Sequence, residues 1–202
     1  MRHARVAISL SMILSLVLVL TACGGARDEA APQAEDEAAQ ETLAQEQQPV
    51  ESPYRIASVR GQAPSGVAVV GDAWGCDASS SVDTLAKDLI AGRVDFAVVP
   101  SDMASQLYNA TAGAVMAVDA VDAGDGLLCV TVVRTEHFAS DPDQVVEFVA
   151  RHGELASGAS GVTFYRGSAM QSAVTEQLKD LYVQDASQVG GQLPPDNFYF
   201  LG

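Results

Sequence analysis

The stretch that decides the fold is SSVDTLAKDLIAGRVDFAVVP, residues 80–100. Its first part repeats apolar residues at helical spacing, which predicts a helix over residues 80–92 with a Ser-x-x-Asp start and Gly92 at its end. A short apolar run follows within two residues. Its β-branched and aromatic content predicts a strand over 94–99 that is covered on both faces.

The same alternation continues along the rest of the chain. Strands are expected over residues 54–60, 114–120, 127–133 and 162–166, and helices over 140–153 and 168–185, with a short helix after a cap at Ser101. Helices that alternate with short strands predict an α/β fold. We expect a mostly parallel sheet flanked by helices, with right-handed crossovers.

The expected sheet indicates where a ligand would bind. Ligands on such sheets usually lie beyond the carboxyl ends of the strands. That rule selects Ser101 and Asp102 after one strand and Asp119 at the end of the next. Asp102 would attract a cation and repel an anion. The alternative is that Ser101 and Asp102 only cap the following helix, which is a commoner role for these residue types.

The N-terminus carries the signals of an exported protein. Arg2 and Arg5 precede an apolar run over residues 6–20, which is shorter than the ~20 residues that span a bilayer. The next tetrad, Leu-Thr-Ala-Cys at 20–23, resembles the bacterial lipobox. The resemblance implies a lipoprotein signal peptide over residues 1–22 and acylation of Cys23. The alternative is an ordinary signal peptide with a chance cysteine.

The segment after Cys23 has a different composition. Residues 24–52 hold eight acidic residues against Arg27 and contain no aromatic residue. Such a segment cannot bury enough apolar surface to offset its ordering entropy, so we expect residues 23–52 to be a lipidated cysteine and a disordered acidic linker. A charged helix is the alternative. Residues 53–202 are long enough for one domain with its own core.

The charge balance limits the partners. The chain has 11 Lys and Arg against 26 Asp and Glu, and without residues 1–22 it keeps 9 basic residues and a formal charge of −17. Nucleic-acid binding depends on clustered Lys and Arg. We therefore expect no nucleic-acid partner.

Two cysteines remain besides Cys23. Outside the cytoplasm Cys76 and Cys129 can form a disulfide. The alternative is two separate thiols, with Cys129 serving as a small buried residue. The three histidines form no metal-ligand pattern with the cysteines. We expect neither a metal ion nor another cofactor.

Two segments resemble a known family. Residues 89–100, LIAGRVDFAVVP, and residues 187–199, SQVGGQLPPDNFY, are similar to solute-binding lipoproteins of bacterial ABC importers, in the branch of the nitrate, sulfonate and thiamine-precursor binders. The resemblance implies one lobe of a type II periplasmic-binding-protein fold. It also implies a small-molecule solute, bound between two lobes, and an ABC permease as the partner.

The resemblance also assigns residues to the site. A glycine-rich loop after the first strand would contact the ligand through Ser65 and Gly66, together with Ser101 and Asp102. Only four residues, 124–127, lie between the segments 120–123 and 128–130, at the point where the second lobe would be inserted. We therefore expect about one lobe in this chain.

These patterns favour a lipoprotein anchored to the bilayer by acylated Cys23, on the extracytoplasmic face of the cell membrane, that binds a small solute for uptake. The alternative is a non-transport surface lipoprotein that uses its single lobe as a protein-interaction module. Tyr54 and the aromatic tail over 198–200 would be its contacts, although packing on the sheet is another role for these side chains. No catalytic motif is visible, so we expect no enzymatic activity.

Overall fold

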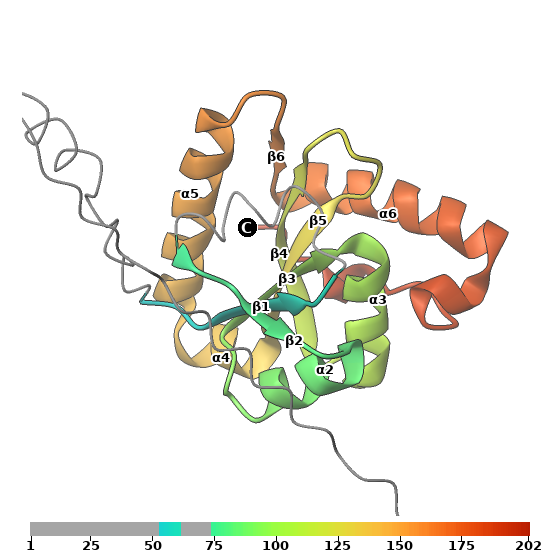
Figure 1. Cartoon of the computed structure of the whole chain (residues 1–202), viewed down its shortest axis with the longest axis horizontal. Helices are drawn as coiled ribbons and strands as arrows, with labels where there is room; N and C mark the ends of the chain where they lie inside the picture. The colour runs from blue at the N-terminus through green and yellow to red at the C-terminus, as the bar shows by residue number, and fades with distance from the viewer. Residues whose placement is uncertain (1–52, 62–73) are drawn as a thin grey trace, which may run out of the picture. The chain divides into compact units, whose positions relative to one another are not determined.

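The computed structural model describes residues 53–61 and 74–202 (Figure 1). Helices and strands alternate through most of this part. The strands are β1 (Ile56–Val59), β2 (Asp77–Ser79), β3 (Phe96–Pro100), β4 (Val115–Asp122), β5 (Cys129–Arg134) and β6 (Thr163–Tyr165). The helices are α2 (Val82–Ile90), α3 (Ser101–Ala110), α4 (Thr135–Ser140), α5 (Pro142–Gly158) and α6 (Gly167–Gln184), with 3-10 turns η1 (Ala186–Val189) and η2 (Asp196–Phe198) near the end.

The six strands form one sheet in the order β2-β1-β3-β5-β4-β6. The predicted α/β fold with flanking helices is confirmed. The predicted mostly parallel sheet is wrong, because β1 pairs in parallel with β2 and β3 while the other three pairs are antiparallel. The reason is the connection between β4 and β5. Its six residues are too few for a crossover, which needs a dozen or more, so the two strands form a hairpin.

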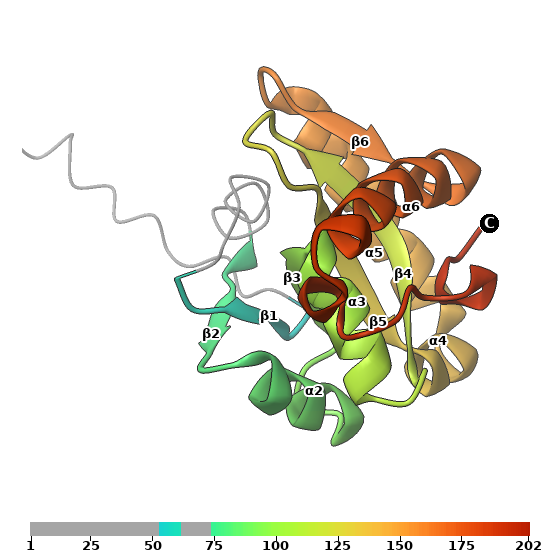
Figure 2. The same ribbon diagram turned by 90° about the vertical axis from the view of Figure 1, so that its right-hand side faces the viewer.

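The helices divide between the two faces of the sheet (Figure 2). The first face is covered by α2, α3 and α6, and its core contains aliphatic side chains such as Leu85, Leu89 and Leu107, all fully buried. The second face is covered by α4 and α5, and its core is richer in rings. Phe96 and Phe148 stack there with ring centroids 3.9 Å apart. Both faces are therefore closed, as the apolar sequence of β3 predicts.

Helix α2 shows how local sequence sets the boundaries. Its cap is Ser81 and not the predicted Ser80, and the Ser81 hydroxyl accepts a hydrogen bond from the Thr84 N–H at 3.2 Å. Gly92 follows the helix with φ +65°, a conformation that favours glycine, so the predicted stop is confirmed. The chain then enters β3 four residues later.

Helix α5 is longer than predicted. It continues past Gly153 to Gly158, and Ala156 in the added turn is fully buried. Gly153 serves packing and does not end the helix, because an added Cβ there would lie 2.9 Å from the Phe164 ring. A glycine inside a helix costs about 1 kcal/mol relative to alanine. Here it lets β6 approach the helix closely.

No helix among residues 53–61 and 74–202 has the length and apolar character to cross a bilayer. The predicted signal peptide, Cys23 and the acidic linker lie outside the described residues.

Candidate solute site at the carboxyl edge of the sheet

The order of the first three strands defines a switch point. The chain goes from β1 to β2 on one side, and α2 then returns it across β1 to β3 on the other side. Parallel strands whose connections diverge in this way leave a crevice beyond their carboxyl ends, where ligands of α/β proteins commonly bind. Ser101 and Asp102 follow β3 at this point, as the sequence predicts.

Ser101 is occupied by contacts within the protein. It is fully buried, its hydroxyl donates to Oε1 of Gln177 at 2.6 Å, and its N–H donates to the Leu128 carbonyl at 2.8 Å. It is also the first residue of α3 and not its cap, which is Pro100. The prediction that Ser101 caps this helix is therefore wrong. Ser101 instead binds the start of α3 to Gln177 and to the Leu128 carbonyl.

Gln177 organises three segments of the edge. Besides the bond from Ser101, its Oε1 accepts the Leu128 N–H at 2.9 Å, and its Nε2 donates to the Gly126 carbonyl at 2.8 Å. One side chain of α6 therefore holds the start of α3 and the β4–β5 turn together. Sequence reasoning missed Gln177, because its partners lie 49 to 76 residues away and no local pattern signals them.

Asp102 keeps an unsatisfied acceptor. Its Oδ1 is buried and has no hydrogen-bond partner within the described residues, while the side chain as a whole is half-buried. Burial raises the pKa of the Asp102 carboxyl, although the N–H groups of Met103 and Asp102 act to lower it. A buried acceptor without a partner is costly. Asp102 can therefore accept a hydrogen bond or a positive charge from a ligand.

Asp119 is not at the edge of the sheet. It lies inside β4, three residues before the strand ends, and is fully buried on the second face. A register shift in the ladder between Ala117 and Asp119 accompanies this placement. Both Asp119 carboxylate oxygens lie 3.1 Å from Nδ1 of His152, which is also fully buried. The predicted edge position is wrong, and the carboxylate is committed to a histidine.

The surroundings of this pair are apolar and incompletely hydrogen-bonded. The His152 ring contacts the rings of Phe148 and Phe164, and its Nε2 has no partner in the described part of the chain. The buried Thr131 hydroxyl, in the residue paired with Asp119 across the ladder, has none there either. The Asp119–His152 pair is a second polar feature that sequence reasoning did not find.

Ser65 and Gly66, the remaining predicted contacts, lie outside the described residues. Cys76 and Cys129 carry free thiols and pack in the same core cluster. Burial raises the pKa of Cys76 to about 11 and that of Cys129 well above its usual value. Neither thiol is ionised near neutral pH, and the thiolate is the reactive form. Their disulfide stays a prediction.

Three of the four proposed contacts of an interaction module are packed inside the protein, and the fourth, Phe200, is half-buried. Tyr54 and Tyr199 are each 5% exposed, and Phe198 is fully buried. Tyr54 contacts Phe96 and Phe148 on the second face, with ring centroids 5.6 and 5.2 Å away. These side chains therefore serve the core, as their alternative role implies.

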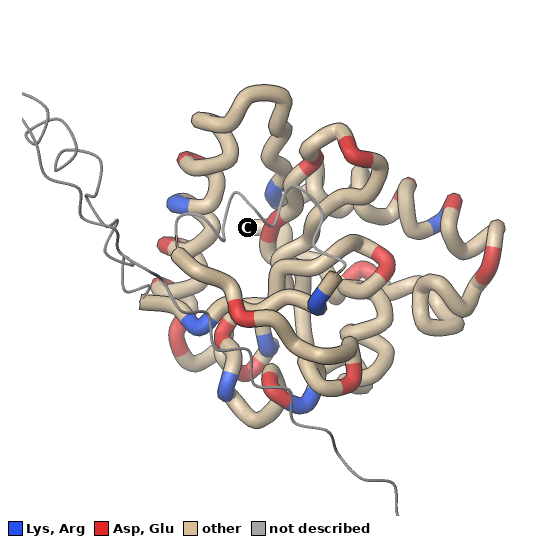
Figure 3. The backbone as a smooth tube through the Cα atoms, in the orientation of Figure 1, with Lys and Arg blue, Asp and Glu red and all other residues tan. Residues whose placement is uncertain are grey.

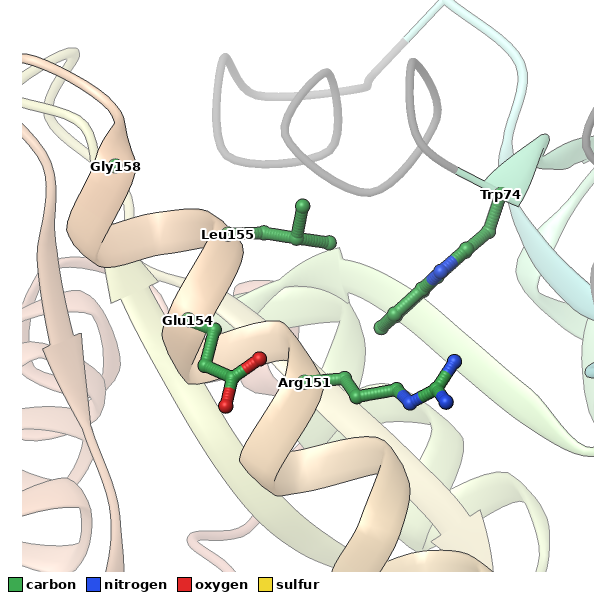
Figure 4. Close-up of a pocket in the computed structure, with 5 residues that line it drawn as sticks. All are labelled: Trp74, Arg151, Glu154, Leu155 and Gly158. Carbon is green, nitrogen blue, oxygen red and sulfur yellow. The ribbon is translucent and has the colours of Figure 1, made fainter.

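A separate hollow of about 520 Å³ lies between α5 and Trp74 (Figure 4). Arg151, Glu154, Leu155 and Gly158 line it from the helix, and Trp74 points toward them from the segment before β2. Arg151 is already paired with Glu147 at 3.2 Å, and Trp74 belongs to the aromatic core. None of the residues predicted from sequence lines this hollow. Among the described residues, no three metal-binding side chains gather in one place.

Comparisons with known proteins assign no family to this chain. No family model matches the chain, and no curated protein matches it. A crystal structure of an ABC transporter from Parabacteroides distasonis is similar with a TM-score of 0.46 and 12% identity, over 73% of this chain and 98% of that chain.

Proposed function

We propose that this chain is an exported lipoprotein, anchored through Cys23 to the extracytoplasmic face of the cell membrane, whose α/β domain binds a small solute. The lipobox-like tetrad at 20–23 supports the anchor. Two or more acyl chains give stable membrane attachment, since each buried CH₂ contributes about 0.8 kcal/mol. The acidic segment over 24–52 would then separate the bilayer from the domain.

The observation that carries solute binding is the Asp102 carboxyl. It lies beyond the carboxyl end of β3 at the switch point of the sheet, with Oδ1 buried and without a partner in the described residues. Gln177 and Ser101 hold this position in place. A solute that donates a hydrogen bond or carries a positive group would supply the partner that Asp102 Oδ1 lacks among the described residues.

A role in uptake rests on the likeness of residues 89–100 and 187–199 to importer proteins. Six residues join β4 to β5, so the described residues provide a single lobe at the site. Drug-sized ligands in proteins usually have 70–90% of their surface buried. An ABC permease or a second protein would therefore supply the other wall. The domain itself binds and delivers the solute and performs no chemistry on it.

Solute binding is tested by thermal unfolding of residues 24–202 with amines, amino acids, sulfonates, inorganic anions and thiamine precursors. A solute at 100 times its dissociation constant should stabilise the protein by about 2.7 kcal/mol. Asp102→Asn should abolish this gain, whereas Asp180→Asn removes an exposed acid from α6 and should keep it. A stabilising solute that remains equally effective on Asp102→Asn would disprove the site.

The anchor is tested separately by labelling cells with palmitate. The wild-type chain should incorporate label and sediment with membranes. Cys23→Ser should lose the label and remain uncleaved, because lipoprotein signal peptidases require the acylated cysteine. Equal labelling of both chains would rule out Cys23 as the anchor and would leave solute binding untouched.

A further inference from the structure

A second groove lies on the second face of the sheet, between α5 and the end of the chain. It has a volume of about 540 Å³, within the range of small-molecule sites. It is separate from the carboxyl edge, since neither Asp102 nor Gln177 lines it. Its lining residues are Val118 from β4, Val146, Val149 and Ala150 from α5, Arg166, Gly167 and Ser168 at the start of α6, and Phe200, Leu201 and Gly202 from the tail.

The groove has an apolar wall that the described residues leave uncovered. Among its lining residues Val118 and Val149 are buried, while Val146 and Leu201 are 53% and 52% exposed. These two belong to a group of only five exposed large apolar side chains in the described part of the chain. Exposed apolar residues that gather at one groove mark a binding surface more often than scattered ones do.

Arg166 is the one charged side chain that lines the groove, and its charge is positive. Arg166 is exposed at its rim and forms no ion pair within the described residues, whereas Arg55, Arg93, Arg134 and Arg151 each pair with an acid. None of the ten lining residues is acidic, although acidic positions outnumber basic ones along the described chain (Figure 3). An apolar wall beside an unpaired guanidinium is complementary to an anionic head group on an apolar chain.

The wall formed by the tail is fixed by backbone contacts. The Phe200 N–H donates to the Ala117 carbonyl of β4 at 2.8 Å. Gly167 has φ +57°, and an added Cβ would lie 2.9 Å from the Leu201 carbonyl oxygen. The tail therefore passes directly against the start of α6. A ligand would meet a formed groove and would not have to order one.

We infer that this groove binds a single-chain amphiphile with a carboxylate head, of the fatty-acid class. The carboxylate pairs with the Arg166 guanidinium and accepts a hydrogen bond from the Ser168 hydroxyl. The acyl chain lies along Val146, Val149 and Leu201. Arginine suits this role, because its planar fork matches a carboxylate with two parallel hydrogen bonds.

The inference is tested by titrating decanoate, below the concentration at which it forms micelles, into ¹⁵N-labelled residues 24–202. Amide shifts should be confined to residues 146–150, 166–168 and 200–202. Arg166→Gln should weaken binding by about tenfold or more, the typical contribution of a charged hydrogen bond. Lys179→Gln is the matched control, since it removes an exposed cation from α6, the helix that Arg166 precedes, and should change affinity by less than about twofold.

Further measurements distinguish decanoate from other ligands that the groove could bind. Decyltrimethylammonium has a similar chain and the opposite charge, and it should not bind in the groove. Absence of decanoate binding, equal losses in Arg166→Gln and Lys179→Gln, or shifts centred on Tyr182 and Val183 would overturn the inference. Binding to phosphatidylglycerol vesicles without decanoate binding would overturn it too and would indicate a membrane surface. Asp102→Asn should leave decanoate binding unchanged, so the two proposed sites can fail independently.

Discussion

The two faces of the sheet are built by different means. On the first face α2, α3 and α6 cover an almost wholly aliphatic cluster, and the polar side chains at its margin are tied by hydrogen bonds, as Ser105 is to the Val189 carbonyl at 2.7 Å. On the second face α4 and α5 cover a cluster of rings that contains a buried acid and a buried histidine. The first face therefore combines aliphatic packing with hydroxyl hydrogen bonds, whereas the second combines ring packing with a buried acid–histidine pair.

The largest expected effect comes from truncating the ring cluster. Phe148 stacks on Phe96 and also contacts Tyr54, Trp74 and His152, so Phe148→Ala should destabilise the protein by about 3–5 kcal/mol. Leu107→Ala on the first face removes fewer atoms and should cost less, within about 2–5 kcal/mol. Urea unfolding of both variants measures the difference. A larger loss in Leu107→Ala would contradict this view of the second face.

The next largest effect is expected at the Asp119–His152 pair, where the contribution of polar pairing can be measured apart from that of packing. Asp119→Ala leaves the buried His152 ring without its acceptor and should cost about 3 kcal/mol. Replacement of both residues by leucine should recover most of that loss, because an apolar pair of similar volume carries no desolvation penalty. A double-mutant cycle by urea unfolding measures the coupling. Additive losses would show that the two residues do not act as a pair.

A smaller effect is expected at Gln177. Gln177→Ala removes three hydrogen bonds and leaves the Ser101 hydroxyl and the Leu128 N–H buried, which should cost about 1–3 kcal/mol. Amide exchange should rise mainly in residues 124–128. Gln171 lies on the same helix and bonds only to Asp196 at 3.1 Å, so Gln171→Ala serves as the control and should cost less. Equal amide exchange in the two variants would show that Gln177 does not hold the β4–β5 turn and the start of α3 together.

The smallest expected effects are on how the stability of the protein depends on pH. Burial alone raises the pKa of the Asp95 carboxyl, but hydrogen bonds from Arg55 outweigh it and lower the pKa below its usual range. The stability that Asp95 contributes is therefore present above the usual carboxyl pKa and is lost as pH falls through the lower, folded-state value. Asp95→Asn should be less stable near neutral pH and should lose less stability on acidification.

The stability contribution of Asp102 depends on pH with the opposite sign to that of Asp95. Burial raises its pKa, so the folded protein binds this proton more tightly than the unfolded chain does. Stability then falls as pH rises from the usual carboxyl value through the raised one. Asp102→Asn should lack this fall and should be at least as stable as the wild type near neutral pH. Urea unfolding of each variant at several pH values checks both signs, and parallel pH profiles in all three proteins would contradict them.

Much of the fold follows from local sequence, but the directions in which the strands run within the sheet do not. Helix α2 was predictable because Leu85, Ala86 and Leu89 repeat at helical spacing between a serine cap and Gly92. The direction of β5 depends on a hairpin, which the apolar residues of the strand do not encode. The short α4 has no buried residue and therefore no apolar pattern to announce it. Strand β2 has three residues, two of them exposed, and gives no signal either.

The candidate site was predictable only in part. Asp102 follows a clear strand and could be placed from the strand–helix boundary. Gln177 could not be found, since its role depends on two segments far away along the chain. Asp119 was misplaced because it looked like the end of a strand that in fact continues to Asp122. Its partner His152 sits 33 residues later, and only the packing of α5 on β4 brings them together.

The β4–β5 turn has a practical consequence for protein engineering. Residues 124–126 are exposed at its tip, while its two ends are adjacent strands of a hairpin, held by Gln177 at Gly126 and Leu128. Exposed tips between closely spaced ends are the positions that best accept inserted domains. A fluorescent or ligand-binding module whose own termini lie close together could be spliced in at Asp125. The inserted module would lie close to the candidate solute site, because the same glutamine bonds to both the turn and the start of α3.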